Sequence, residues 1–309
     1  MSNLAKLARS RPRVARFVPQ LEALEDRNCP SSIAVEGHTL LIRGDAMANT
    51  ISITDDGSGM VSGTIDGETA SGTAINHVVV HSGAGDDTLT YTLTSPLTTR
   101  EHLQIDMGGG KDSATLDFSP GITNTNLKVD FTGHAGDDTL ATMFGPITGS
   151  HVDFRSNLGK GTDTFDGTLL GNITGDSAVR FLVQGGKGAD TLGFHADTTN
   201  IDAGAKLDVN LLGGKGNDAI NVDYAGVLNG KLRLNASGGK GDDMITATAT
   251  LNAGSTGELR GAVRGGSGHD TLTFNVIDNS GGTADVDAFV DGGPGKDTIT
   301  NTPNVKVRR

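Results

Sequence analysis

Short runs of alternating apolar and polar residues recur along the chain from residue 33 onward. In residues 206–211, for example, Leu207, Val209 and Leu211 alternate with polar side chains. A period of two is typical of a strand that buries one face, so each run predicts a short strand. Five runs place apolar residues at the same three positions ahead of a glycine-rich segment: Leu127/Val129/Phe131, Val179/Phe181/Val183, Leu207/Val209/Leu211, Leu232/Leu234/Ala236 and Val286/Ala288/Val290.

The glycine-rich segment is a nine-residue motif that occurs nine times between residues 82 and 300. The fourth residue of every copy is Gly, the sixth is Asp and the eighth is apolar, and successive aspartates are 25 to 28 positions apart. The same turn at a near-constant interval indicates a repeat architecture. The nine aspartates are Asp87, Asp112, Asp138, Asp163, Asp190, Asp218, Asp243, Asp270 and Asp297.

A unit of two short strands and one apolar row cannot bury that row alone, but stacked units can. Equivalent positions then lie above one another at about 4.8 Å, the spacing of paired strands. We therefore expect an all-β fold, a right-handed parallel β-solenoid of about nine to ten rungs of ~26 residues. The alternative is an antiparallel β-sandwich, which does not need a constant period between its turns.

The repeat boundaries divide the chain into three segments. Residues 82–309 are expected to form the solenoid, and residues 33–81 a variant first rung with a capping hairpin. In that second segment Asn49 stands where the repeat has Asp, and Asp66-Gly67 is a hairpin-turn sequence. A cap would protect the edge strands of the solenoid from pairing with other chains. Residues 1–32 are a basic segment expected to be disordered and to act in export or targeting.

Composition and charge exclude several classes of protein. One Cys among 309 residues cannot form an internal disulfide framework, and the apolar runs are too short for a transmembrane segment. The formal charge is −12, and without the basic residues 1–30 the remaining 19 Lys+Arg and 34 Asp+Glu give −15. Nucleic acid is therefore not expected as a partner, since binding its backbone requires a surplus of cations. Small cations are the natural partners of such a surface.

The motif resembles the GGxGxDxUx nonapeptide of RTX, or haemolysin-type, calcium-binding repeats, and GGKGNDAIN (213–221) and GGSGHDTLT (265–273) fit it at every defined position. The resemblance spans residues 82–300 and implies Ca²⁺ held between stacked loops by the nine motif aspartates and main-chain carbonyls, with binding coupled to folding. It is closest in the last five copies, because Met107, His134 and Leu158 replace motif glycines earlier. The chain also has one nonapeptide per turn, whereas that family has two.

A column of aspartates needs a neutralising charge. Neighbouring carboxylates about 4.8 Å apart repel by roughly 3–4 kcal/mol at an effective dielectric constant of about 20. Divalent cations can remove this repulsion, and lysines are the alternative source of positive charge. Four consecutive copies carry Lys at the third motif position, where a solvated outer face is the simpler interpretation: Lys160, Lys187, Lys215 and Lys240.

The N-terminal segment carries a second resemblance. A basic stretch is followed by Leu21-Glu22-Ala23-Leu24-Glu25-Asp26-Arg27 and then Cys29-Pro30-Ser31, an order similar to the N-terminal motif of planctomycete secreted and surface proteins. The segment lacks the apolar core of an ordinary secretory signal. The resemblance implies an export or anchoring address and a secreted or cell-surface location.

These features favour an exported calcium-binding repeat protein with a structural or adhesive role, not an enzyme. No GxSxG elbow, phosphate loop or HExxH motif is present, and the eight His residues form no metal-ligand pattern. One alternative is a calcium-independent solenoid that binds an extracellular polysaccharide, a matrix component or a protein. Another is a polysaccharide lyase-like enzyme, since solenoids host such sites.

Overall fold

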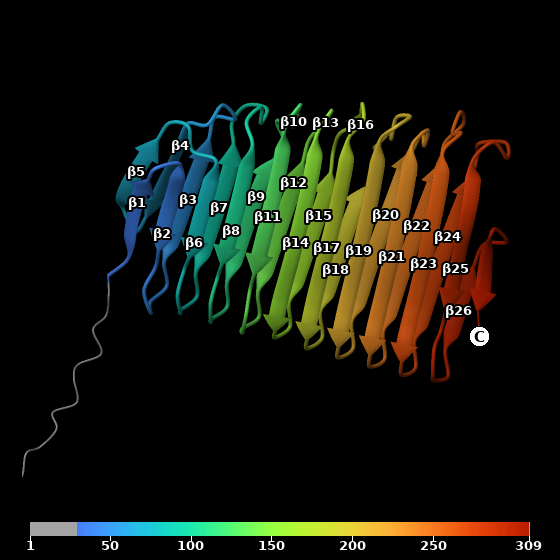
Figure 1. Cartoon of the computed structure of the whole chain (residues 1–309). Helices are drawn as coiled ribbons and strands as arrows, with labels where there is room; N and C mark the ends of the chain where they lie inside the picture. The colour runs from blue at the N-terminus through green and yellow to red at the C-terminus, as the bar shows by residue number, and fades with distance from the viewer. Residues whose placement is uncertain (1–29, 309) are drawn as a thin grey trace, which may run out of the picture.

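A computed structural model describes residues 30–308, and in this range every regular element is a β-strand. The strands stack into an elongated solenoid with a long sheet on each side, so that the chain passes from one sheet to the other in each turn (Figure 1). The N-terminal segment expected to be disordered lies outside the described residues, apart from its last three positions.

The first long sheet contains the strands that precede the glycine-rich motifs. From β2 to β27 all its pairings are parallel, and only β1 is antiparallel to its neighbour. Its spatial order is β1 (Ser32–Glu36), β2 (Thr39–Arg43), β6 (His77–His81), β8 (Glu101–Asp106), β11 (Asn126–Thr132), β14 (His151–Lys160), β17 (Ala178–Lys187), β19 (Lys206–Lys215), β21 (Lys231–Lys240), β23 (Glu258–Ser267), β25 (Asp285–Asp291) and β27 (Val305–Arg308).

The second long sheet contains the strands that follow the motifs, and it is parallel from β3 to β26. Its spatial order is β5 (Glu68–Gly72), β4 (Val61–Ile65), β3 (Thr50–Asp55), β7 (Thr88–Leu93), β9 (Ser113–Phe118), β12 (Thr139–Phe144), β15 (Thr164–Leu169), β18 (Thr191–Ala196), β20 (Ala219–Gly226), β22 (Met244–Leu251), β24 (Thr271–Asp278) and β26 (Thr298–Asn301).

A third, short sheet lies at the return turns and has the order β10 (Ile122–Thr123), β13 (Ile147–Thr148) and β16 (Ile173–Thr174). Parallel pairing in all three sheets excludes the antiparallel sandwich. The predicted β-solenoid is confirmed, with a number of turns close to the nine or ten expected.

The core lies between the two long sheets and follows the alternation in the sequence. In β19 the residues Leu207, Val209 and Leu211 are buried, while the residues between them are partly exposed. Aromatic residues fill this core: the ring centroids of Phe118 and Phe144, in adjacent turns, are 4.8 Å apart, and those of Phe181 and Phe194, which face each other across one turn, are 4.9 Å apart. Adjacent turns therefore bury each other's apolar rows, as a repeat of this size requires.

The N-terminal end is covered by antiparallel strands. β4 pairs with β3 and with β5, and Asp66 and Gly67 form the turn between β4 and β5 with φ of 48° and 92°. Positive φ at both residues is what a two-residue type I′ hairpin requires. Ile33 and Val35 of β1 pack against the core at the same end. The first turn is thus closed by a meander that differs from the repeat.

Candidate functional site

The nine motif aspartates lie in the turns that lead from the first long sheet into the second, one in each turn. Eight have side chains that are at most 2% exposed, and Asp297 in the last copy is half-buried. The alignment expected from the sequence is therefore present, but the carboxyl groups point into the protein. We call these nine residues the aspartate ladder.

Hydrogen bonds connect each aspartate to the preceding turn. The Oδ1 atom of each ladder residue from Asp112 to Asp297 accepts the backbone N–H of the ladder residue one turn earlier, at N–O distances of 2.8 to 3.0 Å. Asn49 donates the first of these bonds to Asp87, and so begins the series in the variant rung. The copies in which Met107, His134 and Leu158 replace motif glycines keep the same bonds, so those replacements do not interrupt the ladder.

The second carboxyl oxygen has no such partner. In the eight buried members, Oδ2 is inaccessible to solvent and lacks a hydrogen bond within residues 30–308. The first glycine of the motif lies against it: a Cβ added to Gly213 would be 2.3 Å from Oδ2 of Asp218, and one added to Gly238 would be 2.1 Å from Oδ2 of Asp243. A buried oxygen without a donor is costly, particularly when it is charged.

Burial makes ionisation of the ladder unfavourable. It raises the pKa of Asp138 to about 7 and the pKa of Asp112, Asp190 and Asp243 to about 6, and the neighbouring ladder carboxyls add to the increase. The N–H bond to Oδ1 works in the opposite direction because it stabilises the carboxylate. Near neutral pH the column therefore needs protons or bound cations to limit its charge.

The invariant fourth glycine lets the turns approach each other closely. In the first eight copies this residue has φ between 106° and 146°, a region that side chains disfavour. A Cβ added to Gly188 would lie 1.5 Å from the carbonyl oxygen of Gly161 in the preceding turn. Glycine at this position is thus required by both the backbone conformation and the stacking distance.

The motif lysines do not pair with the ladder. Lys160, Lys187, Lys215 and Lys240 have exposed side chains, whereas the aspartates of the same turns are buried, and no salt bridge joins the two sets in the described part of the chain. The lysines follow the outer face that the simpler interpretation predicted. Neutralisation of the ladder must come from another source.

A second buried polar group, which the repeat pattern did not identify, lies in the N-terminal turns. Asp55 is fully buried and accepts hydrogen bonds from the Tyr91 hydroxyl at 2.6 Å and the Gly57 N–H at 2.7 Å. Glu101 is 1% exposed, and neither of its carboxyl oxygens has a hydrogen-bond partner in residues 30–308. Burial, with a smaller contribution from Asp55, raises the pKa of Glu101 to about 9.

The alternation of inward and outward positions in the sequence could have identified these two acidic residues. Asp55 continues the inward positions of Ile51 and Ile53, and Glu101 begins those of Leu103 and Ile105. An acidic residue at an inward position of a strand is the feature that could have revealed both.

The histidines contribute ring stacking and ion pairs. The rings of His77 and His102 stack with centroids 4.8 Å apart, and Nε2 of His102 lies 2.8 Å from a carboxyl oxygen of Asp130. Within the described range, no three His, Cys, Asp or Glu side chains gather in the manner of a metal centre. A cation at the ladder would therefore need main-chain carbonyls as additional ligands.

Comparison of the chain with protein-family models, curated proteins and solved structures found no match. Between residues 30 and 308 there is no helix of the length and apolar character needed to cross a membrane.

Proposed function

We propose that this protein is an exported calcium-binding β-solenoid with a structural or adhesive role at the cell surface, and that Ca²⁺ bound along the aspartate ladder is coupled to folding. The observation that carries the proposal is the column of eight buried Oδ2 atoms without hydrogen-bond donors. These atoms are hard, anionic oxygens repeated at every turn, the ligand type that Ca²⁺ prefers.

The donor set fits calcium in its chemistry. Ca²⁺ takes six to eight oxygen ligands, and the turns offer one ladder carboxylate each together with the carbonyls of a glycine-rich backbone. Candidate carboxylate ligands are all nine ladder residues, with the closest motif matches at Asp190, Asp218, Asp243, Asp270 and Asp297. When bound, the ion would offset the charge that burial makes unfavourable.

Burial of the carboxyls supports the coupling to folding. The Oδ2 atoms are inaccessible in the closed stack, so an ion reaches them most easily while the turns assemble. Binding free energy that is available only to the stacked state adds directly to its stability. The resemblance of residues 21–31 to an export motif supports the location.

A calcium-independent solenoid is the second candidate. It is favoured by the N–H bonds to Oδ1, which hold the turns together without a metal, and by the raised pKa values, which allow protons to neutralise part of the ladder. The two candidates differ in whether calcium changes stability at neutral pH.

Thermal unfolding followed by circular dichroism tests the proposal. At pH 7.5 the melting temperature should rise when EDTA is replaced by 1 mM Ca²⁺. It should change less with 1 mM Mg²⁺, because Mg²⁺ requires near-octahedral geometry and loses its bound water reluctantly. An identical melting curve in EDTA and in Ca²⁺ would favour the calcium-independent solenoid.

Two triple variants locate the effect. Replacing Asp218, Asp243 and Asp270 by Asn should weaken the response to calcium and leave the metal-free protein no less stable, because repulsion is removed. The matched control replaces Asp86, Asp137 and Asp242 by Asn. These residues are exposed, and each directly precedes a ladder residue in the sequence. The control changes the net charge equally, and Asn217 already provides the same cross-turn bond from this position. Equal calcium responses in the two variants would contradict a role for the ladder.

A further inference from the structure

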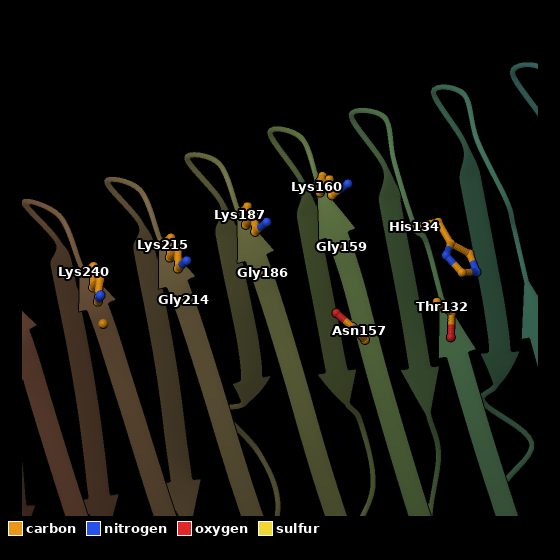
Figure 2. A pocket seen from close by; sticks show the side chains of 11 residues that line it. Thr132, His134, Asn157, Gly159, Lys160, Gly186, Lys187, Gly214, Lys215 and Lys240 are labelled. Atoms are coloured by element: carbon orange, nitrogen blue, oxygen red, sulfur yellow. The ribbon is translucent and has the colours of Figure 1, made fainter.

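The most regular charged feature outside the ladder is a row of four lysines at the C-terminal ends of neighbouring strands in the first long sheet. Each is the last residue of its strand, in β14, β17, β19 and β21, and each is paired in register with the next (Figure 2). At the strand spacing of about 4.8 Å, the four α-carbons span roughly 14 Å in a line. We call Lys160, Lys187, Lys215 and Lys240 the lysine row.

Several other lysines on the same sheet form salt bridges, whereas the lysines of this row form none within residues 30–308. Lys231 lies 3.3 Å from Glu258, and Lys306 lies 3.0 Å from Asp287. No salt bridge to a member of the row is present in residues 30–308, and all four side chains are exposed. Neighbouring ammonium groups of the row repel one another, and an anion lying along the row would offset that repulsion.

The immediate surroundings of the row are mostly neutral. Three positions before the lysines, the strands carry a second row in register, Asn157, Gln184, Leu212 and Ser237, and none of its members is charged. Two positions after the lysines, three of the four motifs carry Thr162, Ala189 and Asn217, and only the last carries an acid, Asp242. The row is therefore a strip of positive charge with few acidic side chains next to it.

The shape of the surface is that of a straight, open groove. Its volume is about 720 Å³, and each lysine of the row lines it together with the glycine that precedes it, Gly159, Gly186, Gly214 or Gly239. Thr132, His134 and Asn157 lie at its N-terminal end (Figure 2). Since glycines leave no side chains to divide the groove into separate pockets, it fits an extended ligand better than a compact one.

We propose that the lysine row binds a linear anionic polysaccharide, a polymer with carboxylate or sulfate groups repeated along its length. A regularly charged chain lying along the groove meets one ammonium group per turn of the solenoid. Within residues 30–308 no Phe, Tyr or Trp lines the groove, so recognition rests on charge and not on stacking against sugar rings. The proposal rests on the adhesive role above and names its partner; it does not depend on which ion the ladder holds.

Nucleic acid fits this surface less well. Binding to single strands combines a cationic groove with aromatic platforms for the bases, and the described residues place no Phe, Tyr or Trp in this groove. An oligonucleotide therefore serves as the competing ligand in the test.

The test measures binding of the full chain to immobilised heparin, neutral dextran and a single-stranded oligonucleotide of similar charge, in EDTA and in 1 mM Ca²⁺. We expect binding to heparin, weakened by salt, and none to dextran. Replacing all four row lysines by Gln should lower the affinity for heparin at least about tenfold, since each exposed ion pair contributes modestly. Circular dichroism of the variant establishes that it is folded.

The matched control replaces Lys111, Lys206, Lys231 and Lys296 by Gln, which removes the same charge from other positions; Lys206 and Lys231 begin the strands that Lys215 and Lys240 end. This variant should lose less than about threefold, as expected for distant charges screened by salt. Equal losses in both variants, no loss in either, no binding of the wild type, or equally tight binding of the oligonucleotide would each overturn the proposal. Heparin binding is measured both in EDTA and in Ca²⁺. If calcium does not change the melting temperature, the calcium proposal fails, but the heparin result still tests the lysine row.

Discussion

The buried carboxyl of Glu101 should make the protein less stable as the pH rises, and Glu101→Gln should remove that dependence. The pKa of this group is about 9 in the folded protein against an ordinary 4.5. Between these values the unfolded chain releases a proton that the folded chain retains. Stability is therefore fully present below pH 4.5 and decreases with increasing pH until about 9.

The magnitude follows from the linkage relation. Each pH unit in this window changes the free energy of unfolding by about 1.4 kcal/mol, so between pH 5 and pH 8 the wild type should lose about 3 to 4 kcal/mol from this group. The glutamine amide stays neutral throughout. Any constant cost of burying the amide affects the variant equally at both pH values, so the difference between the two pH values isolates the titration.

Urea denaturation in EDTA, followed by circular dichroism at pH 5 and pH 8, measures the effect. With a denaturant slope of about 3 kcal/mol per M, the midpoint of the wild type should fall about 1 M further than that of Glu101→Gln. Glu68 in β5 is exposed, and Glu68→Gln should follow the wild type at both pH values. Other titrating groups are common to all three proteins and cancel. If Glu101→Gln and the wild type lose the same stability between pH 5 and pH 8, the assignment of a buried, protonated Glu101 is wrong.

Three further results are expected. Gly188→Ala should cost several kcal/mol of stability in the same urea experiment, because the new Cβ would lie 1.5 Å from the preceding turn. Gly254→Ala is the control: its φ is 91° and no atom lies within 4 Å of the new Cβ, so it should cost only about 1–2 kcal/mol. Tyr91→Phe should lower stability by about 1–3 kcal/mol, since Asp55 then loses a buried hydrogen-bond donor, and equal urea midpoints would refute this. The metal-free wild type should also melt at a lower temperature at pH 7 than at pH 5, because the ladder pKa values are raised above 3.8, and calcium should reduce that difference; a metal-free melting temperature that rises over this range would contradict it.

The fold could be predicted because one local constraint is repeated. The fourth glycine and the sixth residue, Asp, recur at a near-constant interval with strand alternation on both sides, and a stack of turns buries the short apolar rows while explaining that interval. The burial of Leu207, Val209 and Leu211 follows directly from their period. The position of the aspartates in one column was predictable for the same reason.

The orientation of the ladder was not predictable. A period of two assigns faces within a strand, but glycines with positive φ reset the chain direction in the turn, so the alternation does not determine where Asp218 points. Its inward position and its bond to the N–H of Asp190 depend on the three-dimensional path of two adjacent turns. Asp55 and Glu101 were missed for another reason: each occurs once, and a search for repeats passes over single residues.

All hydrogen bonds of the ladder point in the same direction: each carboxyl group accepts the amide of the preceding turn. A substitution in one turn should therefore change the backbone protection of its neighbour. The carboxylate of Asp218 holds the amide of Asp190, while the amide of Asp218 is held by Asp243. Removing the side chain at position 218 should therefore accelerate deuterium uptake by the amide of residue 190, leaving that of residue 218 protected. A substitution in the ladder therefore loosens the backbone of the preceding turn rather than that of its own turn. Local measurements on ladder variants should be interpreted with this shift of one turn toward the N-terminus.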